Sequence, residues 1–226
     1  MKLIVFDCDG TLVDSQHMIV AAMESAFARR ELPPPAREEI LGVVGLSLSV
    51  AVSRLVPHLD AASIDQLAED YKAAFAELRS DPRKREPLYP GVREILFELA
   101  AHNGVLLGVA TGKSRRGVAA ILLREELSEL FHTIQTADTH PSKPDPSMLL
   151  TAMADAGCEP VDTVMIGDTT FDIDMARAAS VRSIGVAWGY HPIDALMDAG
   201  AHAIVHDAVA LAAELAVFSR LTETAP

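Results

Sequence analysis

The 226-residue sequence is poor in cysteine, aromatic residues and basic residues, and it contains no long apolar run. Its two cysteines, Cys8 and Cys158, are too few for a disulfide framework, so we expect a reducing, cytoplasmic location. No run of about 18 apolar residues occurs and the N-terminus lacks a signal-peptide pattern, so no membrane span is expected. With 19 basic and 32 acidic residues the net charge is −13, which argues against nucleic acid and anionic membranes as partners.

The strongest signal lies in the first fourteen residues. Leu3 to Phe6 is a short apolar run that predicts a buried strand, and it leads directly into two carboxylates, Asp7 and Asp9. Removing a carboxylate from water is costly, so two of them at the end of a buried strand call for a cation. Side chains two positions apart on a strand point the same way, so both can reach one point beyond its carboxyl end. The alternative is a strand followed by an ordinary Asp-Gly turn.

A block of about seventy residues after this strand shows only helical patterns. Ser15 is a plausible N-cap for the first helix, and helical periodicity continues, with interruptions at prolines and glycines, to Arg79. A linker rich in turn residues follows and carries the basic run Arg83 to Arg85. This run is either a solvated hinge or an attractor for an anionic substrate.

Strand and helix patterns then alternate to the end of the chain. Fully apolar strands in such an alternation predict a parallel sheet covered by helices on both faces, that is, a doubly wound α/β fold. The first strand needs this sheet to bury itself, so the helical block must be an insertion. We therefore expect an α/β core formed by residues 1–14 and 87–226, with residues 15–86 as an inserted all-helical cap. The tail, residues 222–226, is expected to be disordered. The expected strands are 105–110, 133–136, 163–166, 183–186 and 203–205, and the helices that follow the cap are 92–99, 117–123, 146–156, 173–179 and 208–218.

Polar residues stand at the ends of several of these strands. Thr111 ends the strand 105–110, Asp168 and Asp172 follow the strand 163–166, and Lys143 lies in a loop before a helix. Because the carboxyl ends of parallel strands share one edge, these side chains should meet Asp7 and Asp9 there. Each has an ordinary explanation, since the threonine can cap a helix, the lysine can be a surface residue and the two acids can belong to a turn and a first helical turn.

Together these groups make a coherent chemistry. Three carboxylates suit Mg²⁺, whose coordination is completed by waters and a substrate phosphate. Asp7 can attack phosphorus and become an aspartyl phosphate, while Asp9 can donate a proton to the leaving oxygen and later take one from water. Lys143 and Thr111 can hold the phosphoryl oxygens as charge shifts in the transition state.

These residues resemble the four ordered motifs of the haloacid dehalogenase superfamily of phosphohydrolases. The matching segments are Asp7-Cys8-Asp9-Gly10-Thr11, then Thr111, Lys143, and Gly167-Asp168 with Asp172, and the helical block resembles the C1 cap of that family. The stretch from Leu88 to Val92 is similar to the segment just after the cap in phosphoglycolate phosphatases.

The resemblance implies a role for each of these residues. Asp7 would be the nucleophile and a metal ligand, and Asp9 the acid/base with its backbone carbonyl on Mg²⁺. Asp168 would bind the metal, and Asp172 would be a ligand or an anchor for the ligands. The phosphate would be held by a set of polar and glycine residues, namely Gly10, Thr11, Thr111, Gly112 and Lys143. The second aspartate favours phosphate-ester hydrolysis, because dehalogenases of the superfamily lack it.

Several questions stay open from the sequence. The substrate is expected to be a small phosphorylated metabolite, and the protein a monomer or a homodimer. A sugar phosphomutase is an alternative, although Gly42 to Leu48 lacks the arginine that mutases of the family place near there. A signalling receiver that stores an aspartyl phosphate is another, but receivers have no helical insertion after the first strand. Cys8 is expected to be a small packing residue, and His17 either packs or contacts substrate.

Overall fold

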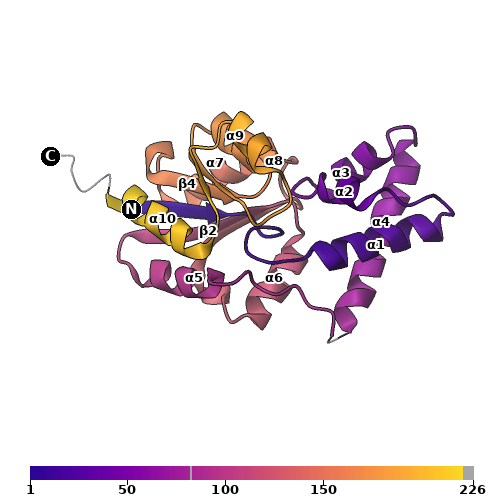
Figure 1. Ribbon diagram of the computed structural model, residues 1–226, viewed down its shortest axis with the longest axis horizontal. Helices are drawn as coiled ribbons and strands as arrows, with labels where there is room; N and C mark the ends of the chain where they lie inside the picture. Colours follow the sequence, from indigo (N-terminus) through magenta and orange to yellow (C-terminus); the bar gives the residue numbers. More distant parts are fainter. Residues whose placement is uncertain (82, 221–226) are drawn as a thin grey trace.

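The computed structural model describes residues 1–81 and 83–220, so the tail expected to be disordered lies outside the described residues. Six parallel strands form one sheet, in the order β3-β2-β1-β4-β5-β6, which places the first strand at its centre (Figure 1). The strands are β1 (Lys2–Phe6), β2 (Val105–Thr111), β3 (Phe131–Thr136), β4 (Thr163–Gly167), β5 (Arg182–Val186) and β6 (Ala203–Val205). The doubly wound α/β fold predicted from the alternation of strands and helices is therefore confirmed.

Helices cover both faces of this sheet (Figure 1). They are α5 (Val92–Ala101), α6 (Arg115–Arg124), α7 (Ser147–Ala156), α8 (Thr170–Ala178), α9 (Ile193–Asp198) and α10 (Ala208–Arg220), with short 3₁₀ helices at Ser128–Leu130 and Pro160–Asp162. In β1, Ile4 and Phe6 pack with α5, α6 and α10, whereas Leu3 and Val5 pack with α7 and α8. This alternation follows from the two-residue period of a strand, and it explains why β1 has to be apolar at every position that faces these helices.

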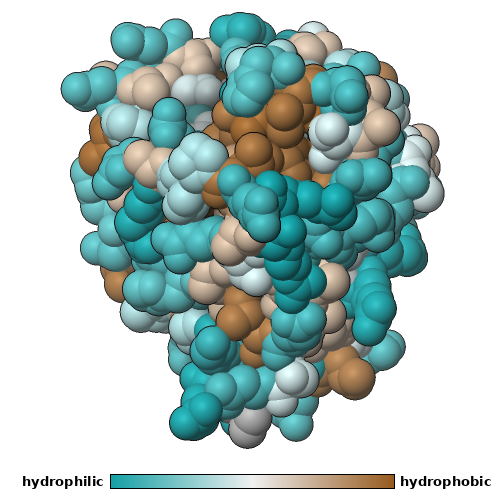
Figure 2. Space-filling model, turned by 90° about the vertical axis from the view of Figure 1, so that its right-hand side faces the viewer, coloured by the Kyte–Doolittle hydropathy of each residue, from teal (hydrophilic) through white to brown (hydrophobic). Residues whose placement is uncertain are grey.

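The segment between β1 and α5 forms a separate helical unit to one side of the sheet (Figure 1). Its helices are α1 (Gln16–Arg29), α2 (Arg37–Leu41), α3 (Leu48–Leu55) and α4 (Ala61–Ser80). They bury their own core, in which Met23, Phe27 and Ile40 of the first two helices meet Val52 and Leu67 of the others. Figure 2, which views this unit end-on, shows a mostly hydrophilic surface with apolar side chains gathered in its upper half.

Two local features differ from the expectation. The helix α9 has no counterpart in the sequence analysis, because six residues with one buried side chain, Leu196, are too short to show a helical period. Ser15 does precede α1, but its hydroxyl makes no cap bond and instead lies 3.1 Å from the hydroxyl of Tyr190. Across the described parts of the chain, none of the helices has both the length and the apolar character that crossing a bilayer requires.

Candidate active site

Three carboxylates from distant parts of the sequence meet at the carboxyl edge of the sheet. Asp7 follows β1, Asp168 follows β4, and Asp172 lies in the first turn of α8. One oxygen of each lies within 4.8 Å of the others, and all three residues are fully buried. The pairing of β1 with β4 produces this meeting, because Phe6 is aligned with Ile166 and the amide of Asp7 donates to the carbonyl of Ile166 at 2.9 Å.

Lys143 reaches this cluster from the loop before α7. Its buried Nζ lies 3.0 Å from Oδ1 of Asp7 and 2.6 Å from Oδ1 of Asp172. Burial lowers the pKa of Lys143, but the two carboxylates outweigh burial and hold its pKa above the ordinary value, so it carries a positive charge. With all carboxylates ionised, three negative charges and one positive charge leave a formal charge of −2.

The three carboxylates differ in the number of hydrogen bonds that they accept. Asp172 accepts from Lys143 and, through Oδ2, from the amide and hydroxyl of Thr169. Asp168 accepts from the hydroxyl of Thr11 at 2.8 Å and from the amide of Tyr190 at 2.9 Å. Both oxygens of Asp7 are buried without a hydrogen-bond partner among the described residues, and the carboxylate forms an ion pair with Lys143. A buried polar atom without a partner is unfavourable, so Asp7 is the carboxylate that still needs one.

Burial also perturbs the acidity of this cluster. Desolvation raises the pKa of Asp7, Lys143 lowers it, and the net result is a pKa of about 7. Desolvation, followed by the charges of Asp172 and Asp7, raises the pKa of Asp168 well above its ordinary value. A positive ion in the cluster would reverse both effects, because it favours the ionised carboxylates.

The residues therefore fit a small divalent cation. Carboxylate oxygens are the donors that hard cations such as Mg²⁺ prefer, at about 2.0–2.1 Å. Such an ion would balance the formal charge of −2 and supply Asp7 with its missing partner.

Gly10 and Thr11 support Asp168. Gly10 has a φ of +86°, and a Cβ placed on it would lie 2.2 Å from Oδ2 of Asp168, so only glycine allows this approach. The hydroxyl of Thr11 is engaged with Asp168. Neither residue is among those that line the adjacent cleft. The structure thus gives both residues a contact other than the phosphate contact that the resemblance implied.

A cleft of about 730 Å³ lies between the sheet with its covering helices α5–α10, here called the sheet unit, and the helical unit formed by α1–α4. Asp7, Asp9, Thr111 and Gly112 are among the lining residues on the sheet side. The hydroxyl of Thr111 accepts a hydrogen bond from the amide of Lys113 at 3.2 Å, which leaves its own proton available to a ligand. A Cβ on Gly112 would lie 2.4 Å from the backbone oxygen of Leu46, so a side chain there would push the two units apart. The helical side contributes mainly apolar side chains, among them Met23, Ile40, Val44, Tyr71 and Phe75.

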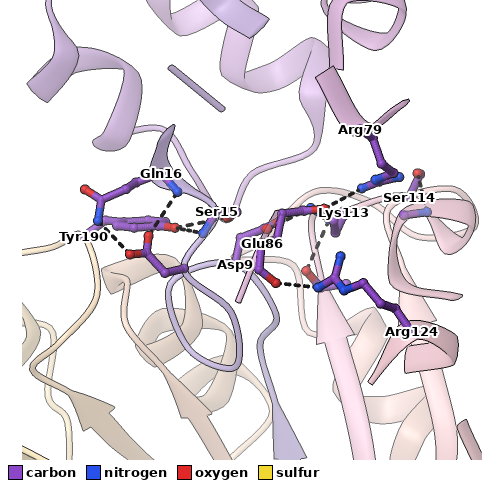
Figure 3. Close-up of polar contacts among 12 residues, drawn as sticks. Asp9, Ser15, Gln16, Arg79, Glu86, Lys113, Ser114, Arg124 and Tyr190 are labelled. Atoms are coloured by element: carbon purple, nitrogen blue, oxygen red, sulfur yellow. Dashed lines mark hydrogen bonds and ion pairs between the residues drawn. The ribbon is translucent and has the colours of Figure 1, made fainter. Parts of the chain in front are cut away.

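Asp9 lies apart from the carboxylate cluster. Its Oδ1 accepts from Nζ of Lys113 at 2.8 Å, and the same ammonium donates to Oε1 of Glu86 at 2.8 Å (Figure 3). Lys113 was not identified from the sequence. It lies beside Thr111 and Gly112 at the end of β2, and this position at a strand end could have predicted that it belongs to the site. Glu86 and Tyr190 lie in loops, so no strand-end position could have predicted that they belong to the site.

Cys8 and His17, which the sequence analysis considered near the first motif, both lie outside the site. Cys8 packs in the core on the side of α5, and burial together with the charge of Asp9 raises the pKa of its thiol, as expected for a packing residue. His17 is exposed on α1 and does not line the cleft.

Comparison with known proteins gives consistent results. Residues 4–186 match the family model described as haloacid dehalogenase-like hydrolase. A phosphoglycolate phosphatase of Pseudomonas putida is 36% identical over 200 residues, which cover 86% of this chain and 73% of that protein. Phosphoglycolate phosphatase 1 of Pseudomonas aeruginosa is 37% identical over 193 residues, which cover 84% and 71%. Among solved structures, a hydrolase from Pseudomonas syringae superposes with a TM-score of 0.85 at 26% identity, covering 96% of this chain and 99% of the other.

Proposed function

The chain belongs to the haloacid dehalogenase-like hydrolases, and we propose that it is a Mg²⁺-dependent phosphatase acting on a small phosphomonoester, with 2-phosphoglycolate as the first candidate. The observation that carries this proposal is the state of Asp7. It is fully buried at the floor of a cleft, lacks a hydrogen-bond partner for either oxygen among the described residues, and lies beside two further carboxylates and a lysine. A carboxylate in this state is poised to bind a cation and to attack phosphorus.

The proposed reaction has two steps. An oxygen of Asp7 attacks phosphorus, the bond from phosphorus to the ester oxygen breaks, and Asp9 donates a proton to that departing oxygen. The products of this step are the free alcohol and an aspartyl phosphate on Asp7. In the second step Asp9 takes a proton from water, the resulting hydroxide attacks the phosphoryl group, and Asp7 is restored as inorganic phosphate leaves.

The other site residues position the charges of this reaction. Lys143 would contact a phosphoryl oxygen while it keeps Asp7 in place, and Thr111 with the backbone at Gly112 would contact the remaining oxygens. Asp7, Asp168 and Asp172 would hold the Mg²⁺, with the backbone carbonyl of Asp9 as a further donor. The bound ion would offset the repulsion between an anionic nucleophile and an anionic substrate. Thr11 and Gly10 would act by fixing Asp168.

We also propose that residues 15–86 act as a cap over the core formed by residues 1–14 and 87–226. The separate apolar core of the helical unit supports this division, as does its position across the cleft from Asp7. A cap that closes over a small substrate excludes water from the reaction.

Phosphate release from a panel of metabolite phosphates, with Mg²⁺ or with a chelator, tests the proposal. We expect hydrolysis of 2-phosphoglycolate or a related small ester with Mg²⁺, loss of activity with chelator, and loss of activity in Asp7→Asn. Asp174→Asn is the matched control, because Asp174 is a partly exposed residue of α8 paired with Arg177. Full activity of Asp7→Asn, or activity unaffected by chelator, would contradict the proposal. Conversion of a hexose 1-phosphate to its isomer would instead favour a phosphomutase.

A further inference from the structure

Lys113 is an almost buried cation in contact with Asp9. Its side chain is 9% exposed, and its Nζ lies 2.8 Å from both Oδ1 of Asp9 and Oε1 of Glu86 (Figure 3). Burying an ammonium is costly unless it is paired. Burial lowers the pKa of Lys113, but the two carboxylates outweigh burial and raise its pKa above the ordinary value. The two acids therefore hold a charged lysine at this position.

Glu86 is fixed on several sides. Its side chain is 1% exposed, and its second oxygen, Oε2, accepts from Nη2 of Arg79 at 3.0 Å. Its backbone oxygen accepts from the guanidinium of Arg124 on α6 (Figure 3). Asp9, Glu86, Lys113 and Arg79 carry two negative and two positive charges, so this network is neutral as a whole. The network therefore adds no net charge that would attract an anion, and its contribution is to fix the positions of its own side chains.

The helical unit takes part in the same network. Arg79 is in the last turn of α4, and its guanidinium lies 5.0 Å from the ring centre of Phe75 on the same helix. Nζ of Lys113 also lies 5.0 Å from the centre of that ring. Contacts of a cation with an aromatic ring at this distance are attractive. The place of Lys113 thus depends both on Glu86 and on α4 lying against the sheet unit.

We propose that Lys113 is a positioning residue for Asp9, and that Glu86, braced by Arg79, holds Lys113 for this purpose. The inference rests on the proposed function, in which Asp9 protonates the departing alcohol. Lys113 anchors Oδ1 of Asp9, while Oδ2 accepts no hydrogen bond from the residues that the structure describes, and Asp9 lines the cleft. Anchoring one oxygen restricts rotation of the carboxyl group and keeps the other available to the leaving oxygen.

This role predicts a particular dependence on the leaving group. An ester whose alcohol is a weak acid needs a proton as its bond to phosphorus breaks, whereas a nitrophenolate leaves readily without one. Displacing Asp9 should therefore slow phenyl phosphate much more than 4-nitrophenyl phosphate. A general loss of packing or of phosphate binding would slow both esters equally, because they differ only in a ring substituent.

The experiment measures kcat/KM of Lys113→Met with these two esters, since this ratio includes the step in which the alcohol departs. We expect the loss with phenyl phosphate to exceed the loss with 4-nitrophenyl phosphate by about tenfold, a fraction of what a general acid contributes. Glu86→Gln should show the same selectivity with a smaller loss, and it retains the test if Lys113→Met does not fold. Lys84→Met, which changes an exposed lysine of the linker, is the matched control and should leave both rates unchanged.

Equal losses with both esters, or no loss in either variant, would overturn the inference. Asp9→Asn serves as the reference, because it must show the selective loss in full. If wild-type protein releases phosphate neither from these esters nor from the panel of metabolite phosphates, the proposed function fails and this inference fails with it. Hydrolysis by the wild type without selectivity in the Lys113 and Glu86 variants would overturn the inference alone.

Discussion

Replacing Asp7 with asparagine is expected to abolish turnover and, in the absence of metal, to make the protein more stable at alkaline pH. The pKa of Asp7 rises from 3.8 to about 7 on folding, with desolvation as the largest cause. Between these two values the folded protein keeps a proton that the unfolded chain has lost. The unfolded state is therefore favoured more and more as the pH rises through this window, and stability is lost. Asparagine does not titrate, so the variant is free of this loss.

The magnitude follows from the shift in pKa. Each unit corresponds to about 1.36 kcal/mol, so the ionised Asp7 costs about 4 kcal/mol above pH 7. At pH 5 less than half of this cost is present, so Asp7 alone should remove about 2–3 kcal/mol between pH 5 and pH 8. The gain in the asparagine variant is an upper limit, because an amide is a weaker acceptor for Lys143 than a carboxylate is.

Urea unfolding in chelator at pH 5 and pH 8 measures this difference. The single tryptophan, Trp188, is a suitable probe, because its indole donates to the backbone oxygen of Thr11 beside the site. Titrating groups far from the cluster cancel when the two pH dependences are subtracted, whereas Asp168 is coupled to Asp7, so the difference reports the two carboxylates together. Asp174→Asn should behave like the wild type.

Adding Mg²⁺ at 100 times its dissociation constant should stabilise the wild type by about 2.7 kcal/mol, and Asp7→Asn by less. The reasoning is refuted if wild type and Asp7→Asn lose the same free energy of unfolding from pH 5 to pH 8.

Three further substitutions test other parts of the site. Lys143→Met leaves buried carboxylates without their cation, so we expect the free energy of unfolding at pH 8 in chelator to fall by about 3–5 kcal/mol, measured by urea unfolding. Gly112→Ala places a methyl group against the backbone oxygen of Leu46 and should raise KM severalfold in steady-state kinetics, by separating the two units. Tyr190→Phe removes the contact with the hydroxyl of Ser15 and should cost about 1 kcal/mol in urea unfolding. Phosphate release should be unchanged in Tyr190→Phe, because the backbone amide of residue 190, which donates to Asp168, is retained.

The central sheet could be predicted because its strands are continuous apolar runs at regular intervals. The apolar run Leu3–Phe6 has no buried position other than the middle of a parallel sheet, and the structure places it there. The convergence of Asp7 and Asp168 follows from that prediction, since neighbouring parallel strands end at one edge. Asp172 could be placed in the same way, because it lies one helical turn after the strand end. In these cases local pattern and topology together fix the position of a side chain.

The remaining contacts depend on loops, whose conformations local patterns do not specify. Ser15 is a typical N-cap residue directly before α1, yet its hydroxyl contacts the hydroxyl of Tyr190, which lies 175 residues away in the sequence. Glu86 lies in a linker between units, and its partners come from α4, α6 and the end of β2. Such partners are brought together by the packing of the units, and no spacing in the sequence encodes them.

The distribution of hydrogen bonds among the acids separates structural roles from chemical ones. Asp172 and Asp168 have protein partners for both oxygens, so each is held in a fixed orientation. Among the described residues, Asp9 accepts a hydrogen bond at one oxygen, whereas Asp7 has an ion pair with Lys143 at Oδ1 and no hydrogen-bond partner at either oxygen, although it is as deeply buried as any of them. A fold selected for stability alone would pair or replace a fully buried carboxylate that has no hydrogen-bond partner among the described residues, and here that carboxylate is Asp7. The two oxygens without hydrogen-bond partners are what the roles proposed for Asp7 require, one oxygen to bind a cation and one to attack phosphorus.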